Sequence, residues 1–162
     1  MGSTLFDKIW NDHLVGARED GRALLYIDRH IVHDLHAPHA FKELTRQARA
    51  VRRKDLTRVV QDHTAPTRNN LDTLSDNMRV SQQLSQQHAV HFVDHQSAQH
   101  GISHIISVEQ GWALPGKTLA CPDSHASTVG RWDASLLGVA RRSWYTSWPP
   151  KPWRLPSQNN CE

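Results

Sequence analysis

The sequence is poor in the features that mark secreted, membrane-bound or fibrous proteins. Its 162 residues include two cysteines, Cys121 and Cys161, which are too few for a disulfide framework. No apolar run approaches the length of a membrane span, and the start MGSTLFDKIWNDH lacks the apolar core of a signal peptide. These absences predict a cytoplasmic protein without a membrane anchor.

Aromatic residues make up only 7% of the chain, and the formal net charge is only +3. With 38% hydrophobic and 22% charged residues, the composition is that of a soluble globular domain long enough to bury a core. Positive charge is concentrated in residues 46–58, a stretch that would attract the phosphates of a nucleic acid. No aromatic residue is interleaved there for base stacking, so we favour a solvated helix end and loop and expect no nucleic-acid partner.

Segments typical of strands and helices alternate along the first 130 residues. Short apolar runs bounded by polar or turn residues predict strands at 24–27, 56–60, 90–93, 104–108 and 118–121. Helical periodicity predicts helices after Thr4, after Pro38 and over 71–87. The alternation predicts an α/β fold, with a layered, mostly parallel sheet and flanking helices, whose ligands collect at the carboxyl ends of the strands.

Aspartate and histidine stand close together directly after two of these predicted strands. Two segments carry them: QDHTAPT, which contains Asp62 and His63, and CPDSHAST, which contains Asp123, Ser124 and His125. A carboxylate beside an imidazole stabilises the protonated ring, which is the form that a general acid needs. Taken alone, either segment is also compatible with an ordinary turn at the end of a strand.

Together with two further segments, these motifs resemble a known family. LLYIDRHIVHD, QDHTAPT, HGISHIISVEQGWALPGKT and CPDSHAST stand in the order, and at close to the spacing, of the first active-site segments of 3-isopropylmalate dehydratase large subunits. Those proteins are iron–sulfur hydro-lyases of the aconitase family. The resemblance runs over residues 4–130. It departs from the family at Cys121-Pro122, where Cys-Gly is usual, and at His36 and His39, which match no motif of the family.

The resemblance implies a reaction that removes water from one carbon of a hydroxydicarboxylic acid and returns it to the neighbouring carbon. In leucine biosynthesis this interconverts 2-isopropylmalate and 3-isopropylmalate. A 4Fe-4S cluster with one iron not held by cysteine supplies the Lewis acid in the full-length family. Its cysteines lie beyond residue 162 and a separate small subunit carries the carbon base, so this chain is expected to be an N-terminal fragment that holds no cluster and is inactive alone.

Catalytic roles carry over by resemblance to five residues. His63 would donate the proton to the leaving hydroxyl, with Asp62 in the same acid pair. His104 matches a second active-site histidine. Asp123 and His125 match the pair that hydrogen-bonds the iron-bound hydroxyl or water. These roles predict that both segments reach one substrate.

Two further residues are predicted to bind substrate. Ser124 matches a carboxylate-binding hydroxyl, and His33 stands where aconitase has a substrate-contacting glutamine. His33 also belongs to a run of histidines at every third position over 30–39, a pattern that could suggest zinc. In an α-helix, side chains spaced three residues apart point in successively different directions, and Pro38 interrupts the run. Four imidazoles therefore cannot converge on one ion, and no metal site is predicted. Another hydro-lyase of the family, such as a homoaconitase or a methylmalate-type dehydratase, and a binding module for metal or nucleic acid remain alternative functions.

The composition changes after Gly130. Tryptophan and proline crowd into 131–162 without periodicity, which predicts two parts: a partial aconitase-like α/β domain at 4–130 and an aberrant, poorly ordered tail at 131–162. Codons chosen for 139–155 and read with a shift of one nucleotide permit GTSELVHVLATQTVAL, which resembles the segment expected here in the family. The hypothesis is that the tail is out of frame; a polyproline II ligand is the alternative interpretation.

Overall fold

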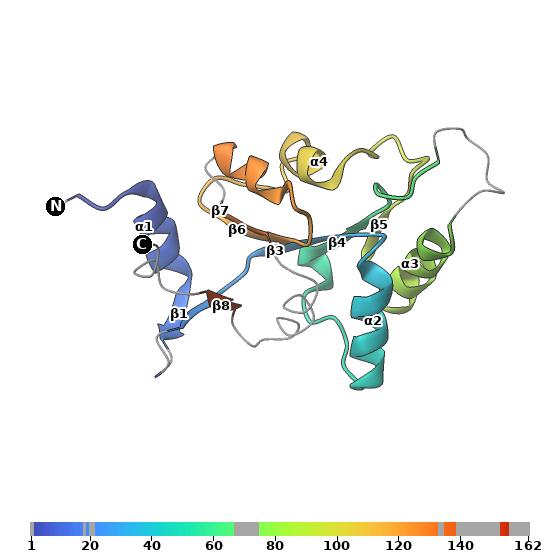
Figure 1. Ribbon diagram of the computed structural model, residues 1–162, viewed down its shortest axis with the longest axis horizontal. Helices are drawn as coiled ribbons and strands as arrows, with labels where there is room; N and C mark the ends of the chain where they lie inside the picture. The colour runs from blue at the N-terminus through green and yellow to red at the C-terminus, as the bar shows by residue number, and fades with distance from the viewer. Residues whose placement is uncertain are drawn as a thin grey trace.

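The chain forms two sheets, which lie side by side in the computed structural model (Figure 1). The structure describes residues 2–17, 19, 22–66, 75–132, 135–138 and 153–155. One sheet has five parallel strands and is called the main sheet; the other has three antiparallel strands. Helices cover both faces of the main sheet, so the predicted α/β fold is confirmed.

The main sheet has the strand order β5-β4-β3-β6-β7. Its strands are β3 (Arg29–His33), β4 (Thr57–Val60), β5 (His91–Val93), β6 (Thr118–Cys121) and β7 (Ser135–Gly138). In the parallel register His33 lies opposite Val60, and Val60 lies opposite Val93. The strands β3, β4 and β5 therefore end level. Since β6 runs parallel beside β3, the residues that follow β3, β4 and β6 lie at one edge of the sheet.

Helices lie in two layers on the main sheet. Helices α2 (Ala37–Arg46) and α3 (Asp76–Gln87) cover one face, and α4 (Ser103–Glu109) with the 3-10 helix η3 (Ala126–Trp132) covers the other (Figure 1). Successive strand residues alternate between these layers. Val32 packs in the core under α2, whereas its neighbour Ile31 packs in the core under α4 and η3.

Several of the predicted elements form where the sequence indicated. The α2 helix has Pro38 in its first turn, as predicted, and buries an apolar stripe that includes Phe41 and Leu44. The strands β4, β5 and β6 match the runs at 56–60, 90–93 and 118–121, and the 3-10 helix η1 (Lys54–Leu56) precedes β4. Helix α3 matches the later part of 71–87, and residues 71–74 lie outside the described residues.

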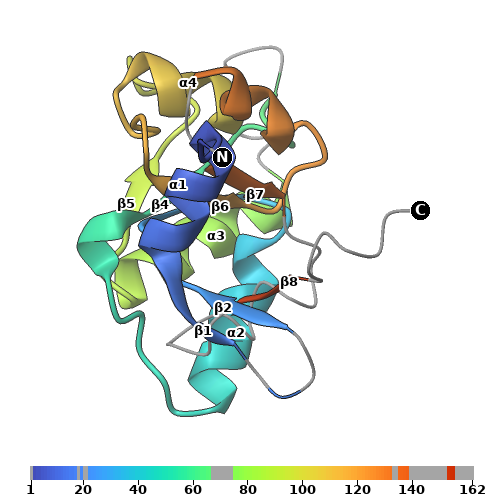
Figure 2. The same ribbon diagram turned by 90° about the vertical axis from the view of Figure 1, so that its left-hand side faces the viewer.

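The N-terminal helix α1 (Leu5–His13) begins with the predicted cap at Thr4. The Thr4 hydroxyl accepts the backbone N–H of Asp7, and the Asp7 carboxylate accepts the backbone N–H of Thr4. The smaller sheet follows, with β1 (Leu14–Ala17), β2 (Ala23–Leu25) and β8 (Trp153–Leu155). Figure 2 looks onto this end of the molecule, where α1 stands in front of the main sheet.

The strand predicted at 104–108 is wrong, because Ser103–Glu109 form the helix α4. The β-branched residues of this segment favour a strand by local propensity. Its buried residues recur at helical spacing instead: Ser103, Ile106 and Ser107. Packing of this face against the main sheet overrides the propensity. It places His104 in the first turn of a helix whose N-terminus lies at the carboxyl edge of the sheet.

Two strands lie in the segment predicted to be a tail. The β7 strand pairs in parallel with β6, and Trp153–Leu155 pairs with β2. The other residues of the tail, including Cys161, lie outside the described residues, except for the end of η3. In the described part of the chain, no helix has the length and apolar character needed to cross a membrane.

Candidate functional site

Three segments with aspartate and histidine meet at the carboxyl edge of the main sheet. They follow β3, β4 and β6, and His63 links two of them. Its Nδ1 lies 2.7 Å from the carboxylate of Asp62, and its Nε2 lies 3.2 Å from the carboxylate of Asp123. The fold thus brings the QDHTAPT and CPDSHAST segments together through one imidazole.

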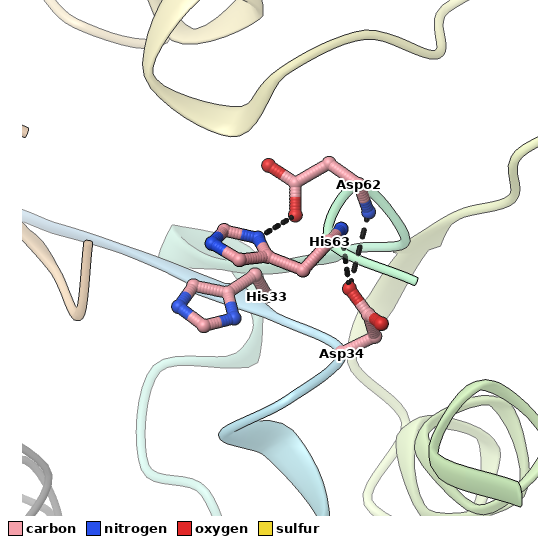
Figure 3. A group of neighbouring side chains, drawn as sticks. All are labelled: His33, Asp34, Asp62 and His63. Carbon is pink, nitrogen blue, oxygen red and sulfur yellow. Dashed lines mark hydrogen bonds and ion pairs between the residues drawn. The ribbon is translucent and has the colours of Figure 1, made fainter. Parts of the chain in front are cut away.

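Asp34 anchors the backbone at Asp62 and His63 (Figure 3). One carboxylate oxygen of Asp34 accepts the backbone N–H of Asp62 at 3.2 Å and that of His63 at 2.9 Å. The other accepts the backbone N–H of Thr64 at 3.1 Å and also the Thr64 hydroxyl. Because Asp34 is fully buried, these four hydrogen bonds hold the turn that presents His63.

Asp62 lies between His63 and the start of α4. One of its oxygens contacts the His63 ring, and the other accepts the backbone N–H of Ser103 at 2.7 Å. The Asp62 side chain is only 2% exposed, whereas that of His63 is 29% exposed. The Asp62 carboxylate is therefore buried, whereas the His63 imidazole is accessible to solvent.

Asp123 is surrounded by histidines. Besides His63, the Nδ1 atoms of His104 and His125 each lie 3.6 Å from the Asp123 carboxylate. Burial opposes ionisation of Asp123, but the backbone N–H of His125 and the nearby imidazoles outweigh it and hold the pKa of the carboxyl below its ordinary value. Asp123 is therefore an anion at neutral pH, able to stabilise a protonated imidazole beside it.

His33 packs flat against His63. The two ring centroids are 3.7 Å apart and the rings are inclined by 16° (Figure 3). The Nε2 of His33 donates to the carbonyl of Pro122 at 2.8 Å and lies 2.8 Å from the Nδ1 of His36. Burial lowers the pKa of His33, and a charge on His63 would lower it further. His33 therefore supports the His63 ring as a neutral partner.

Ser124 and His125 form the exposed side of the site. Both residues are exposed, and the His125 side chain is 76% exposed. The Ser124 hydroxyl lies 3.1 Å from the Nδ1 of His125. The Asp123 carboxylate accepts the backbone N–H of His125 at 2.6 Å, so one turn orients all three residues. This is the face by which a small molecule can reach His63.

The structure places all seven predicted site residues in one neighbourhood, although His104 comes from a helix and not from a strand. Three contributors were missing from the prediction: Asp34, His36 and the backbone N–H of Ser103. A strand over 29–33 would have revealed Asp34, because it then follows a strand end as Asp62 and Asp123 do. No pattern in the sequence points to Ser103 once its segment is interpreted as a strand.

The four residues of Figure 3 are also the group whose ligand atoms lie close enough to share a metal ion, all within 4.8 Å of one another: His33, Asp34, Asp62 and His63. Two contacts argue against this use. Both Asp34 oxygens are already filled by hydrogen bonds, and the nearly parallel rings of His33 and His63 cannot direct in-plane lone pairs at one point. The group is a carboxylate–imidazole network, suited to moving and orienting a proton.

A comparison with protein-family models gives one further finding about the chain. Residues 7–155 match the model of the Aconitase family (aconitate hydratase). The match spans every segment of the site and reaches both sheets.

Proposed function

Because the chain belongs to the aconitase family, we propose that it is part of the large subunit of a 3-isopropylmalate dehydratase. Family membership supports hydro-lyase chemistry in general. The finer assignment, interconversion of 2-isopropylmalate and 3-isopropylmalate in leucine biosynthesis, rests on the four ordered segments named above. The observation that carries the chemistry is the position of His63 between two carboxylates, at 2.7 Å and 3.2 Å.

His63 is proposed to give a proton to the departing hydroxyl. Its Nδ1 lies beside the Asp62 carboxylate and its Nε2 beside the Asp123 carboxylate, so both ring nitrogens are oriented by the site. The stacked His33 restricts rotation of the ring, and Asp34 fixes the backbone that carries it. A donor held by four neighbours meets the positional demand of general acid catalysis.

Substrate is proposed to approach over the exposed turn after β6. The Ser124 hydroxyl can donate to a substrate carboxylate, and the exposed His125 can contact the hydroxyl that is removed or returned. His104 lies beside Asp123, and its side chain is 15% exposed. His33 is only 1% exposed and its ring covers His63, so its proposed role is to support the His63 ring and not to contact the substrate directly.

Full-length members of the family generally bind a 4Fe-4S cluster, which cysteine thiolates hold. Among the described residues the single cysteine is Cys121, which is buried at the end of β6. Burial, with the nearby Asp123 and Asp62, raises the pKa of this thiol, so it is a poor ligand. The donor set in the described part of the chain does not fit the cluster. A small subunit is proposed as the partner that supplies the carbon base.

The proposal is tested with a large subunit in which residues 4–130 of this chain are continued by the cluster-bearing part of the family and paired with the small subunit. The assay compares kcat/KM for 2-isopropylmalate, 2-methylmalate and homoisocitrate. A clear preference for 2-isopropylmalate supports the assignment. A preference for either other acid assigns the chain to another branch of the family. No hydration or dehydration of any of them rejects the proposed function.

A further inference from the structure

A second charged cluster lies at the opposite edge of the main sheet. Arg29 begins β3 and Arg58 lies near the start of β4, and both guanidinium groups lie over the ring of Trp112. The Arg58 group is 4.1 Å from the ring centroid and the Arg29 group is 4.7 Å from it. Four residues of strand, about 13 Å, separate Arg29 from His33, so this arginine pair is distinct from the site described above.

Both arginines are held in place by the loop that follows α4. The Nη1 of Arg29 donates to the carbonyls of Gly111 and Trp112, and the Nη1 of Arg58 donates to the side-chain oxygen of Gln110 at 3.0 Å. These bonds use one nitrogen of each guanidinium. Each group keeps further N–H donors for a ligand, because a guanidinium carries five.

The arginine pair has no acidic partner in the described part of the chain. None of the ion pairs there includes Arg29 or Arg58. Burial, and next the charge of Arg29, lower the pKa of Arg58. His91, opposite Arg58 in the sheet, adds a third polar group to the same edge.

Trp112 gives an independent sign of a missing acceptor. Its side-chain N–H has no hydrogen-bond partner among the described residues, although the residue is only 9% exposed. A buried indole N–H normally has an acceptor. The cluster therefore contains cations and a donor but no anion. Because the indole is buried, it cannot stack with a nucleic-acid base, which argues against an RNA or DNA site.

We propose that Arg29 and Arg58 bind a phosphate group, as free phosphate or as a phosphomonoester. Two guanidinium groups carry two positive charges, which a dianion neutralises and a single carboxylate does not. Arginine also matches the oxygens of a phosphate with pairs of parallel hydrogen bonds. The proposal goes beyond the proposed function and does not depend on it, since neither arginine belongs to the dehydratase site.

The test is a titration of the complete 162-residue chain, labelled with ¹⁵N, at constant ionic strength maintained with chloride. The readouts are the indole N–H of Trp112, assigned by its loss in Trp112→Phe, and the Nε–H signals of the arginines. Inorganic phosphate should give saturable shifts, and acetate should bind at least about 10-fold more weakly because it satisfies one guanidinium only. Comparison with glycerol 3-phosphate decides between the free and the esterified group. Binding by neither rejects the proposal.

Variants decide whether the arginine pair is responsible. Arg29→Met and Arg58→Met should each weaken phosphate binding at least about 10-fold, the worth of a charge-assisted hydrogen bond. Arg49→Met, which changes an exposed arginine beyond α2, should bind as the unchanged chain does. If a methionine variant does not fold, Arg58→Lys is the substitute. It keeps the positive charge but loses the planar guanidinium that donates parallel hydrogen bonds, so this variant should still bind phosphate more weakly than the unchanged chain. Equal affinity in folded Arg58→Met, or shifts that chloride alone reproduces, would overturn the proposal.

Discussion

Asp34 controls the position of His63 through the backbone: its buried carboxylate accepts the His63 N–H at 2.9 Å. The same carboxylate accepts the neighbouring backbone N–H groups of Asp62 and Thr64. One side chain at the end of β3 thus fixes the turn at the end of β4. The stack of His33 on His63 comes from the same two strands, so the level ends of β3 and β4 set both the place and the orientation of the proposed acid.

Replacing Asp34 by Asn should therefore destabilise the chain strongly. The amide keeps the shape of the side chain but turns one acceptor into a donor that faces backbone N–H groups, leaving buried donors without a partner. Unsatisfied buried donors cost about 1–3 kcal/mol each, so we expect a loss of about 3 kcal/mol in the free energy of unfolding. Urea denaturation measures it. Asp12→Asn, on the exposed side of α1, is the control and should change stability by less than about 0.5 kcal/mol.

His63→Ala should slow the complete enzyme described above about 10²–10⁴-fold in kcat, the usual worth of a positioned general acid. The reason is that the ring between Asp62 and Asp123 is the proposed proton donor. His39→Ala, exposed on α2, is the matched control and should keep the activity. A fully active His63→Ala enzyme would leave the family membership intact and reject the role given to His63.

The sequence indicated that Asp62 and Asp123 lie near each other, because each follows an apolar run that forms a strand. The carboxyl ends of neighbouring parallel strands lie at the same edge of a sheet. The sequence did not indicate α4, since the β-branched residues of that segment favour a strand and only packing on the sheet decides otherwise. The role of Asp34 was hidden for a related reason. The strand predicted at 24–27 corresponds to β2, and no strand was predicted at β3, so Asp34 did not stand at a predicted strand end. Its hydrogen bonds also join residues that sequence spacing alone cannot pair.

The stability of the chain should fall as the pH falls from about 6.5 toward about 4. Burial lowers the pKa of His30 to about 4 and also lowers that of His33, so in this window the unfolded chain binds protons that the folded chain excludes. His30 alone accounts for up to about 3 kcal/mol, at about 1.4 kcal/mol per pKa unit. The lowered pKa values of Asp28 and Asp123 act only at more acidic pH, as those carboxylates become protonated.

Urea midpoints at several pH values test this dependence. His30→Gln removes the titrating ring, so its stability should vary less between pH 6.5 and 4.5 than that of the unchanged chain. His39→Gln changes an exposed histidine on α2 and should follow the curve of the unchanged chain. Stability that is constant or that rises on acidification through this range would show that His30 and His33 are not held neutral by the fold.

Cys121 should be inert toward alkylation while the chain is folded. Its thiol is buried at the end of β6, and burial together with Asp123 and Asp62 raises its pKa, so almost no reactive thiolate forms near neutral pH. Iodoacetamide should modify it at least about 100-fold more slowly in buffer than in urea, as followed by mass spectrometry of the peptide that contains it. Val129→Ala opens the core that packs around Cys121 without touching a charge, and should raise the rate in buffer. Equal rates in buffer and in urea would mean that the thiol is accessible and ionised, and the argument that Cys121 is a poor cluster ligand would fail with it.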